Sequence, residues 1–130
     1  MSEEFKIEIV NPEKSFLIRE DVTEVVAPAF EGEMGILKDH ISIISFLKPG
    51  IIKISSKSSN ESYYVEDGIL EFKNNNLSIL TSSIFNVSDI DKSTQQDLLK
   101  KAEEEIKKPE INDQSRYLID QKIEVLKSLN

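Results

Sequence analysis

The sequence predicts a mainly β protein with added α-helices: an N-terminal antiparallel β-sandwich over residues 1–87, followed by a C-terminal hairpin of two α-helices over residues 88–130. Two observations predict this fold class. Up to about Val87 the chain consists of short runs rich in Val, Ile, Phe and Tyr that turn residues separate, which is typical of a sandwich or barrel. Beyond Val87 the apolar residues recur at the spacing of an α-helix instead.

The first strand is predicted from Phe5 to Val10, because apolar and polar residues alternate there and Asn11-Pro12 ends the run. Later apolar runs are also predicted as strands: 16–18, 22–28, 41–47, 51–54, 63–65, 69–72 and 77–80. Asp67-Gly68 is typical of a hairpin turn. In the run 63–65, strand alternation should bury one of two neighbouring tyrosine rings in the core and turn the other outward.

The first helix is predicted over about residues 89–107, where Ser88 opens a capping-box pattern and the proline that follows ends the helix. Its apolar residues form one narrow stripe: Leu98, Leu99, Ala102 and Ile106. The second helix is predicted from Asn112 or Asp113, either of which can cap it, to Leu129. Neither helix has enough apolar surface to be stable alone, so each must pack on the other, on the sandwich or on a partner.

The balance of 24 acidic against 16 basic side chains gives a net charge of −8, which argues against binding to nucleic acid, since that needs a basic surface. The same charge argues against adhesion to an anionic membrane. No apolar stretch approaches the roughly 20 residues of a membrane-spanning helix. The acidic start of the chain is also unlike a signal or transit peptide. We therefore expect no nucleic-acid partner and no direct membrane insertion.

Candidate catalytic groups are few. Glu31 and Glu33 flank Gly32 near His40, which is the single histidine, and could be imagined as an acid–base pair of a small hydrolase or as a metal site. A glycine-rich surface loop with solvated charges is the favoured interpretation, because one histidine without cysteine or HExxH spacing is a poor metal signal. Nucleotide-binding glycine motifs and GxSxG are absent. We expect no catalytic site, no metal and no cofactor; a free-standing β-sandwich adaptor, whose helical tail docks a partner, remains an alternative.

The stretch EGEMGILKDHISIISFLKPGIIKI, from Glu31 to Ile54, resembles the epsilon subunit of bacterial F-type ATP synthase, which corresponds to the delta subunit in mitochondria. The family shows the same EGE pattern, a histidine at the same spacing, and then KPG before an aliphatic strand. Gly68-Ile69-Leu70-Glu71 matches its later GILE strand. The resemblance covers the whole chain, because the family also combines a β-sandwich with a helical hairpin.

The resemblance implies a non-catalytic rotor subunit of the central stalk that couples proton translocation to ATP synthesis through contacts with the gamma subunit and the c-ring. It implies a peripheral location on the cytoplasmic face of the bacterial inner membrane. By position, Glu33 would lie toward the c-ring and His40 toward gamma. Glu31, Gly32 and Gly35 complete the interface that the resemblance implies.

In the family, the hairpin can also extend along gamma into the alpha/beta hexamer and obstruct ATP hydrolysis, with basic residues facing beta. The resemblance implies five candidates here: Lys107, Lys108, Arg116, Lys122 and Lys127. Because these are few and Asp113, Asp120 and Glu124 lie among them, we expect weak or no inhibition.

Some family members bind ATP through the motif I-[DL]-x-x-R-A at the start of the first helix. Ile90 and Asp91 match this motif, but Thr94 and Gln95 stand at its Arg and Ala positions. Without the guanidinium, the fixed fork of donors suited to phosphate is missing. We therefore expect no ATP binding below millimolar concentrations.

Overall fold

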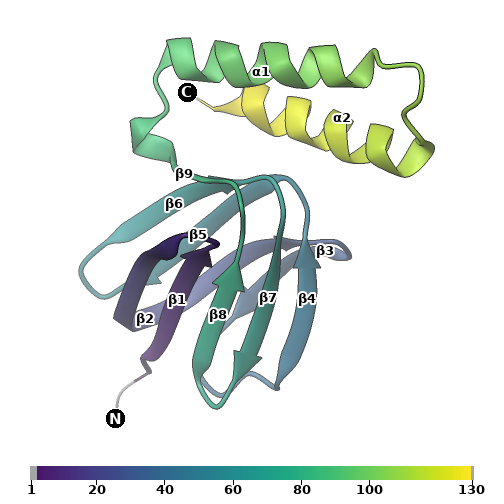
Figure 1. The fold of residues 1–130 in the computed structure, drawn as a ribbon. Coiled ribbons are helices and arrows are strands. Elements are labelled where there is room, and N and C mark those ends of the chain that lie inside the picture. Colours follow the sequence, from purple (N-terminus) through teal and green to yellow (C-terminus); the bar gives the residue numbers. More distant parts are fainter. Residues whose placement is uncertain (1–2, 130) are drawn as a thin grey trace.

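Two packed layers of β-strands carry a pair of α-helices across one end in the computed structural model, which describes residues 3–129 (Figure 1). The strands are β1 (Phe5–Asn11), β2 (Lys14–Ala29), β3 (Gly32–Ile36), β4 (Ile43–Leu47), β5 (Gly50–Ser56), β6 (Asn60–Val65), β7 (Gly68–Lys73), β8 (Asn76–Leu80) and β9 (Ile84–Asn86). A 3-10 turn (Val87–Asp89) leads to α1 (Lys92–Ile106) and α2 (Asp113–Ser128). Within the described residues, neither helix is long and apolar enough to cross a bilayer.

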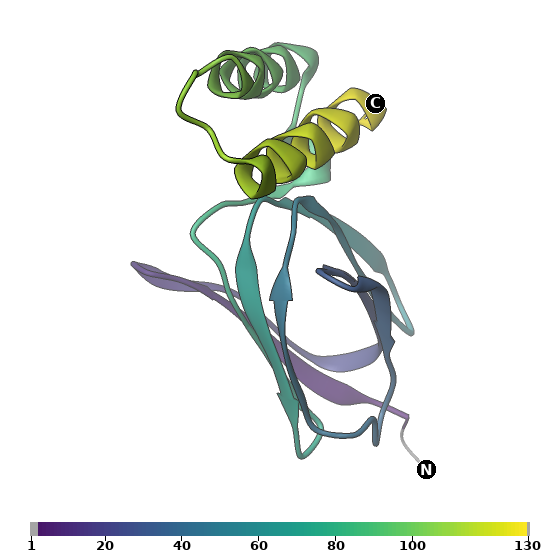
Figure 2. The same cartoon turned by 90° about the vertical axis from the view of Figure 1, so that its right-hand side faces the viewer.

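One layer contains β1, β8, β7 and β4, and the other contains β5, β6 and β9 (Figures 1 and 2). The long strand β2 joins them, because its first half pairs with β1 and its second half lies between β5 and β3. The described strand pairs are antiparallel except β1 and β8, which run parallel. The predicted sandwich with a helical hairpin is therefore confirmed, with one parallel pair that the sequence did not indicate.

Strand β2 corrects the prediction of two strands over 16–18 and 22–28. The polar residues Arg19, Glu20 and Asp21 do not form a turn; they are exposed side chains on one continuous strand. Arg19 pairs with Ile7 of β1 in the ladder and reaches Glu61 with its guanidinium, so its polarity is satisfied without a break in the strand.

The connection at Asp67-Gly68 corrects the predicted hairpin turn, because β6 pairs with β5 and β9 whereas β7 pairs with β4 and β8. The chain crosses between the two layers at this point. Gly68 has φ +154°, and a Cβ there would lie 2.9 Å from the carbonyl oxygen of Leu80. Gly50 of KPG also has no room for a side chain, because a Cβ would lie 2.5 Å from the Cβ of Pro28. The glycines of KPG and GILE are thus both required by close packing.

Two strands were not predicted from the sequence. The expected glycine-rich loop after Glu31 is strand β3, which pairs along the second half of β2. The short strand β9 adds to the edge of β6. In β3 the alternation is short, because only Met34 and Ile36 mark the core side and two of its five residues are glycines. The three residues of β9 are all half-buried and show no alternation.

The two neighbouring tyrosines of β6 separate two apolar clusters. Tyr63 lies in the sandwich core, where its ring meets the edge of Phe16 at a centroid distance of 5.7 Å. Tyr64 points out of the sandwich as predicted, but the hairpin covers it, and its ring stacks on Phe85. The expectation of an outward ring is therefore corrected to a ring that is fully buried between the sandwich and the helices.

The hairpin is folded down on the sandwich, with α2 between α1 and the strands (Figure 2). Asp91 caps α1, since its Oδ1 accepts a hydrogen bond from the amide of Thr94 at 2.7 Å. The predicted capping box at Ser88 is wrong, because Ser88 belongs to the preceding 3-10 turn. Asn112 caps α2 in the same way, which confirms one of the two predicted caps.

Candidate protein interface

Four exposed apolar side chains gather on the outer side of the layer that contains β4, β7 and β8. Phe46 of β4 pairs with Ile69 of β7, and Ile69 pairs with Leu80 of β8. Because directly paired residues point to the same side of a sheet, these three form a row across the layer. Phe30, in the turn after β2, places its ring 6.4 Å from that of Phe46. We call Phe30, Phe46, Ile69 and Leu80 the outer apolar face; each is between 42% and 61% exposed.

A groove of about 550 Å³ follows the outer apolar face and continues to Pro12. Among the described residues that line it, Asp67 alone is charged. Its carboxylate accepts hydrogen bonds from the hydroxyls of Thr81 and Ser82, so it is already satisfied within the chain. A contiguous apolar patch with satisfied polar neighbours is typical of a protein–protein interface.

The sequence contained a signal for this face that the strand prediction did not use. Residues 43–47 read IISFL, with apolar side chains on both sides of the strand. A strand that covers a core on one side normally alternates with polar residues on the other. The departure from alternation at Ile44 and Phe46 predicts that something covers the outer side as well.

The EGE motif forms the tip and one arm of a β-hairpin. Phe30 and Glu31 make the turn between β2 and β3, and Gly32, Glu33 and Gly35 belong to β3. Both carboxylates are exposed. The structure therefore brings four of the five predicted interface residues together on one projecting hairpin.

His40 lies apart from that hairpin, in the loop between β3 and β4. Its ring edge packs on Phe72 at a centroid distance of 5.9 Å, and its Nδ1 lies 2.7 Å from the carbonyl oxygen of Ile41. These described contacts include no carboxylate, so the acid–base pair of the hydrolase hypothesis is not formed. Across residues 3–129 no group of three or more His, Asp or Glu side chains is placed to hold a metal ion.

Comparison with known proteins identifies the family. A profile of the β-sandwich domain of the ATP synthase delta/epsilon chain matches residues 4–87. The chain belongs to the ATP synthase delta/epsilon family. It is 77% identical to the ATP synthase epsilon chain of Pelagibacter ubique over 130 residues, which is the full length of both. It is 36% identical over 107 residues to ATP synthase subunit delta, mitochondrial, of Schizosaccharomyces pombe, covering 81% of this chain and 64% of the relative.

The fold also occurs in a chain of a solved ATP synthase structure. A chain in the structure of the Euglena gracilis mitochondrial ATP synthase, which contains OSCP, F1 and the c-ring, superposes with a TM-score of 0.76. The match covers 99% of this chain and 81% of that chain, at 20% identity. The likeness thus includes the helical hairpin as well as the sandwich.

The five basic tail residues suggested by the delta/epsilon resemblance differ in their surroundings. Lys107, Lys108 and Lys127 are exposed, and Arg116 is exposed with one nitrogen 3.3 Å from the carbonyl of Ile106 at the end of α1. Lys122 is different, because its side chain is only 16% exposed. In the folded hairpin, four of the five cations are therefore accessible to a partner.

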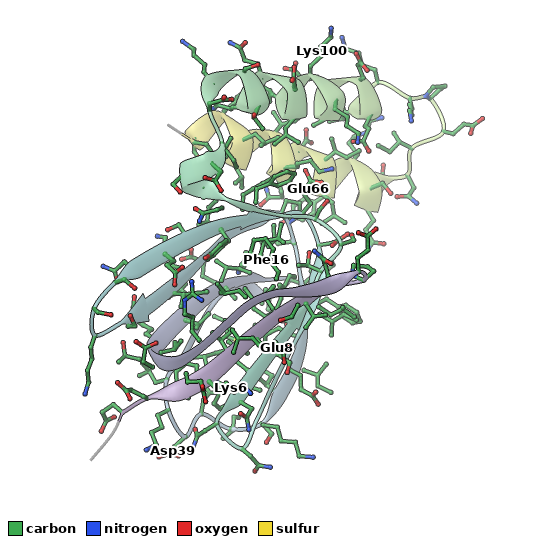
Figure 3. All side chains as sticks on the ribbon, turned by 60° about the vertical axis from the view of Figure 1, so that its left-hand side comes forward. Lys6, Glu8, Phe16, Asp39, Glu66 and Lys100 are labelled. Carbon is green, nitrogen blue, oxygen red and sulfur yellow. The ribbon has the colours of Figure 1, made fainter. Side chains whose placement is uncertain are left out.

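Lys122 instead joins the hairpin to the sandwich. Its Nζ lies 3.8 Å from Glu66, which precedes β7, and 3.7 Å from Glu105 at the end of α1. Glu66 sits where the two parts meet (Figure 3) and also accepts a hydrogen bond from the hydroxyl of Tyr64 at 2.9 Å. Burial, together with the nearby carboxylate of Glu66, raises the pKa of Tyr64 far above its ordinary value, so its hydroxyl stays a donor.

The positions of the delta/epsilon nucleotide motif have structural roles in this chain. Asp91 caps α1, and the hydrogen bond from the amide of Thr94 lowers the pKa of its carboxyl. Gln95 donates from Nε2 to the carbonyl oxygens of Leu126 and Leu129, at 2.6 and 2.7 Å. This amide occupies the end of α2, where the carbonyl of Leu126 also accepts the amide of Leu129 at 3.3 Å.

Proposed function

We propose that this chain is a rotor subunit in the central stalk of an F-type ATP synthase, where it couples proton translocation to ATP synthesis. Its membership of the delta/epsilon family supports a place in the complex, and the outer apolar face is the observation that supports a tightly bound protein partner. The subunit acts by binding and does no chemistry itself. It lies on the cytoplasmic face of the membrane, held there by its partners.

The outer apolar face is the proposed contact with gamma. Burying exposed Phe, Ile and Leu side chains against a partner yields about 25 cal/mol for each Å² removed from water. A subunit that transmits torque needs a contact that does not slip, and a row of three strands offers a stiff surface for it. His40 belongs to this contact in our proposal on the strength of the family resemblance, since its ring packs on Phe72, which faces the core of the sandwich.

The β2–β3 hairpin is the proposed contact with the c-ring. Glu31 and Glu33 are exposed to solvent near its tip. Gly32 and Gly35 carry no side chains, so the backbone is accessible at these two positions. Exposed charges bind polar loops through hydrated contacts that contribute more to specificity than to affinity. The accessible tail cations, Lys107, Lys108, Arg116 and Lys127, are the proposed contacts of an extended hairpin with the alpha/beta hexamer, whereas Lys122 would first have to leave Glu66.

Replacing two members of the outer apolar face tests the proposed function. We expect Phe46→Ser/Leu80→Ser to bind purified gamma at least about tenfold more weakly than the wild type, because two large apolar contacts are lost. Both residues are at least half exposed, so the free chain should unfold at nearly the same temperature. Titration calorimetry with gamma measures the affinity.

Tyr117→Ser is the matched control, since Tyr117 is 52% exposed but lies on α2. It should bind gamma like the wild type. Equal affinity of the double variant and the wild type would refute the assigned face. Failure of a tagged wild-type chain to recover gamma, alpha, beta and c subunits from its native membranes would refute the stalk function and favour the free-standing adaptor.

A further inference from the structure

The loop from Leu37 to Ser42 keeps a defined shape at the end of the sandwich opposite the helices, where Figure 3 shows Asp39. A tight turn forms within it, since the amide of His40 donates to the carbonyl of Leu37 at 3.1 Å. The third residue of this turn, Asp39, has φ +67°. That conformation is normally taken by Gly or Asn, and it costs energy for a residue with a side chain.

Asn75 holds Asp39 in this conformation. The Oδ1 of Asn75 accepts the backbone amide of Asp39 at 2.7 Å, and its Nδ2 donates to the carboxylate of Asp39 at 3.0 Å. Asn75 is itself fixed in the turn between β7 and β8, where its carbonyl accepts the amide of Lys6 at 3.2 Å. One side chain thus fastens the loop to the sheet with two hydrogen bonds across 36 residues of sequence.

The loop that Asn75 fastens carries large apolar side chains that are exposed to solvent. Ile41 is 77% exposed and Leu37 is 56% exposed. Ile44, a little farther along β4, is 68% exposed, and Phe46 follows it on the same side of the strand. Ile44 continues the outer apolar face along β4 toward the loop, and Ile41 lies three residues before it in the sequence.

We propose that Asn75 is a positioning residue for partner binding: it fixes the 37–42 loop so that Ile41 extends the outer apolar face toward gamma. The inference rests on the proposed function, since gamma is the occupant of that face. A free loop would have to lose its conformational entropy on binding, whereas a loop already fastened by Asn75 does not. In this proposal, the unfavourable backbone conformation of Asp39 is tolerated because it holds Ile41 in one position.

The turn offers a matched pair of substitutions. Asn74 and Asn75 both have left-handed backbones, with φ +52° and +59°, so a glycine fits either position without strain. The side chain of Asn74 is exposed, and that of Asn75 holds Asp39. Asn74→Gly therefore reproduces the backbone effect of Asn75→Gly without releasing the loop.

We expect Asn75→Gly to speed hydrogen exchange of the Asp39 amide at least tenfold and to weaken gamma binding about five- to tenfold, while Asn74→Gly changes neither. The two variants should unfold at similar temperatures. Equal gamma affinity of the two variants, with a wild type that does bind gamma, would overturn the positioning role and leave the proposed function intact. A wild type that does not bind gamma would overturn both, and unchanged exchange at Asp39 would overturn the fastening by Asn75.

Discussion

A small polar network on the sandwich shows how neighbouring residues shift each other's pKa values. It consists of Arg19, Glu61 and Tyr63. Arg19 contacts both carboxylate oxygens of Glu61, at 3.1 and 3.0 Å, and Tyr63 donates to the same carboxylate at 2.8 Å. Burial acts to raise the pKa of Glu61, but these hydrogen bonds outweigh it and the pKa is lowered. Burial and the Glu61 carboxylate together raise the pKa of Tyr63 to about 12. At neutral pH Arg19 and Glu61 are thus held in their charged forms, and Tyr63 stays a neutral hydrogen-bond donor.

Replacing Glu61 should reveal this network as a pH-dependent contribution to stability. Because the pKa of Glu61 is lower in the folded state, its contribution is complete above the unfolded pKa of about 4.3 and is lost as the pH falls through the folded value. We expect Glu61→Gln to lower the free energy of unfolding by roughly 1 kcal/mol at pH 7, since one partner, Arg19, is substantially exposed.

Urea unfolding at pH 7 and pH 3 measures this effect, and the difference from the wild type should shrink at pH 3. Glu71→Gln is the control, because Glu71 is an exposed residue of β7. A difference that persists unchanged at pH 3 would mean that the carboxylate charge is not what stabilises the strand.

At the scale of elements, the hairpin depends on contacts between helices more than on the stability of each helix. Gln95 near the start of α1 satisfies two carbonyls at the end of α2. The buried residues of the two helices are Ala102, Ile119 and Leu126, and partly buried apolar side chains of both helices pack against them. Two direct hydrogen bonds at one end therefore add to the apolar contact that keeps the helices side by side.

We expect Gln95→Met to destabilise the hairpin by about 1 kcal/mol, because the partly shielded carbonyl of Leu129 loses the Gln95 donor and that of Leu126 keeps only the amide of Leu129. Methionine retains the length and helix propensity of glutamine. Gln96→Met is the control, since Gln96 is the next residue and is exposed. Thermal unfolding followed by helical circular dichroism compares the two, and equal melting curves would show that the Gln95 bonds contribute little.

The sequence predicted the elements whose pattern reflects one buried side. Phe5 to Val10 alternate as a half-buried strand should, and Asn112 caps a helix where it was expected. The prediction was wrong where a run of polar residues had two possible explanations. Arg19 to Asp21 were interpreted as a break between two strands, but they are exposed residues within one strand. The outer apolar face depends on register, since Phe46, Ile69 and Leu80 are distant in sequence and meet only through strand pairing. The EGE residues and His40 remain predictions from the family motif, because residues outside the core leave no periodic signal.

At the scale of the whole molecule, the hairpin and the sandwich meet through one apolar cluster and one lysine. Tyr64 and Phe85 of the sandwich face Leu126 and neighbouring residues of the helices. The ion pairs of Lys122 with Glu66 and Glu105 are long, at 3.8 and 3.7 Å, and contribute little free energy by themselves. The apolar cluster is therefore the main attachment of the hairpin.

We expect deletion of residues 89–130 to change the ATPase rate of the assembled F1 complex less than about twofold. The physical reason is that the accessible cations of the tail are few and acidic residues lie among them, so attraction to an acidic partner surface is weak. ATP hydrolysis by complexes reconstituted with either chain gives the measurement. A large rise in rate on deletion would show that the tail is a strong inhibitor.

The parallel pairing of β1 with β8 also bears on how the chain is made. Lys6 to Val10 lie beside Asn76 to Leu80, so the first of the described strands borders one of the last strands of the sandwich. Until then β1 has only β2 to pair with, and its other edge stays open to neighbouring nascent chains. Closure of such a distant pair is slow compared with the formation of a hairpin. One edge of β1 therefore stays unpaired until most of the sandwich has been synthesised.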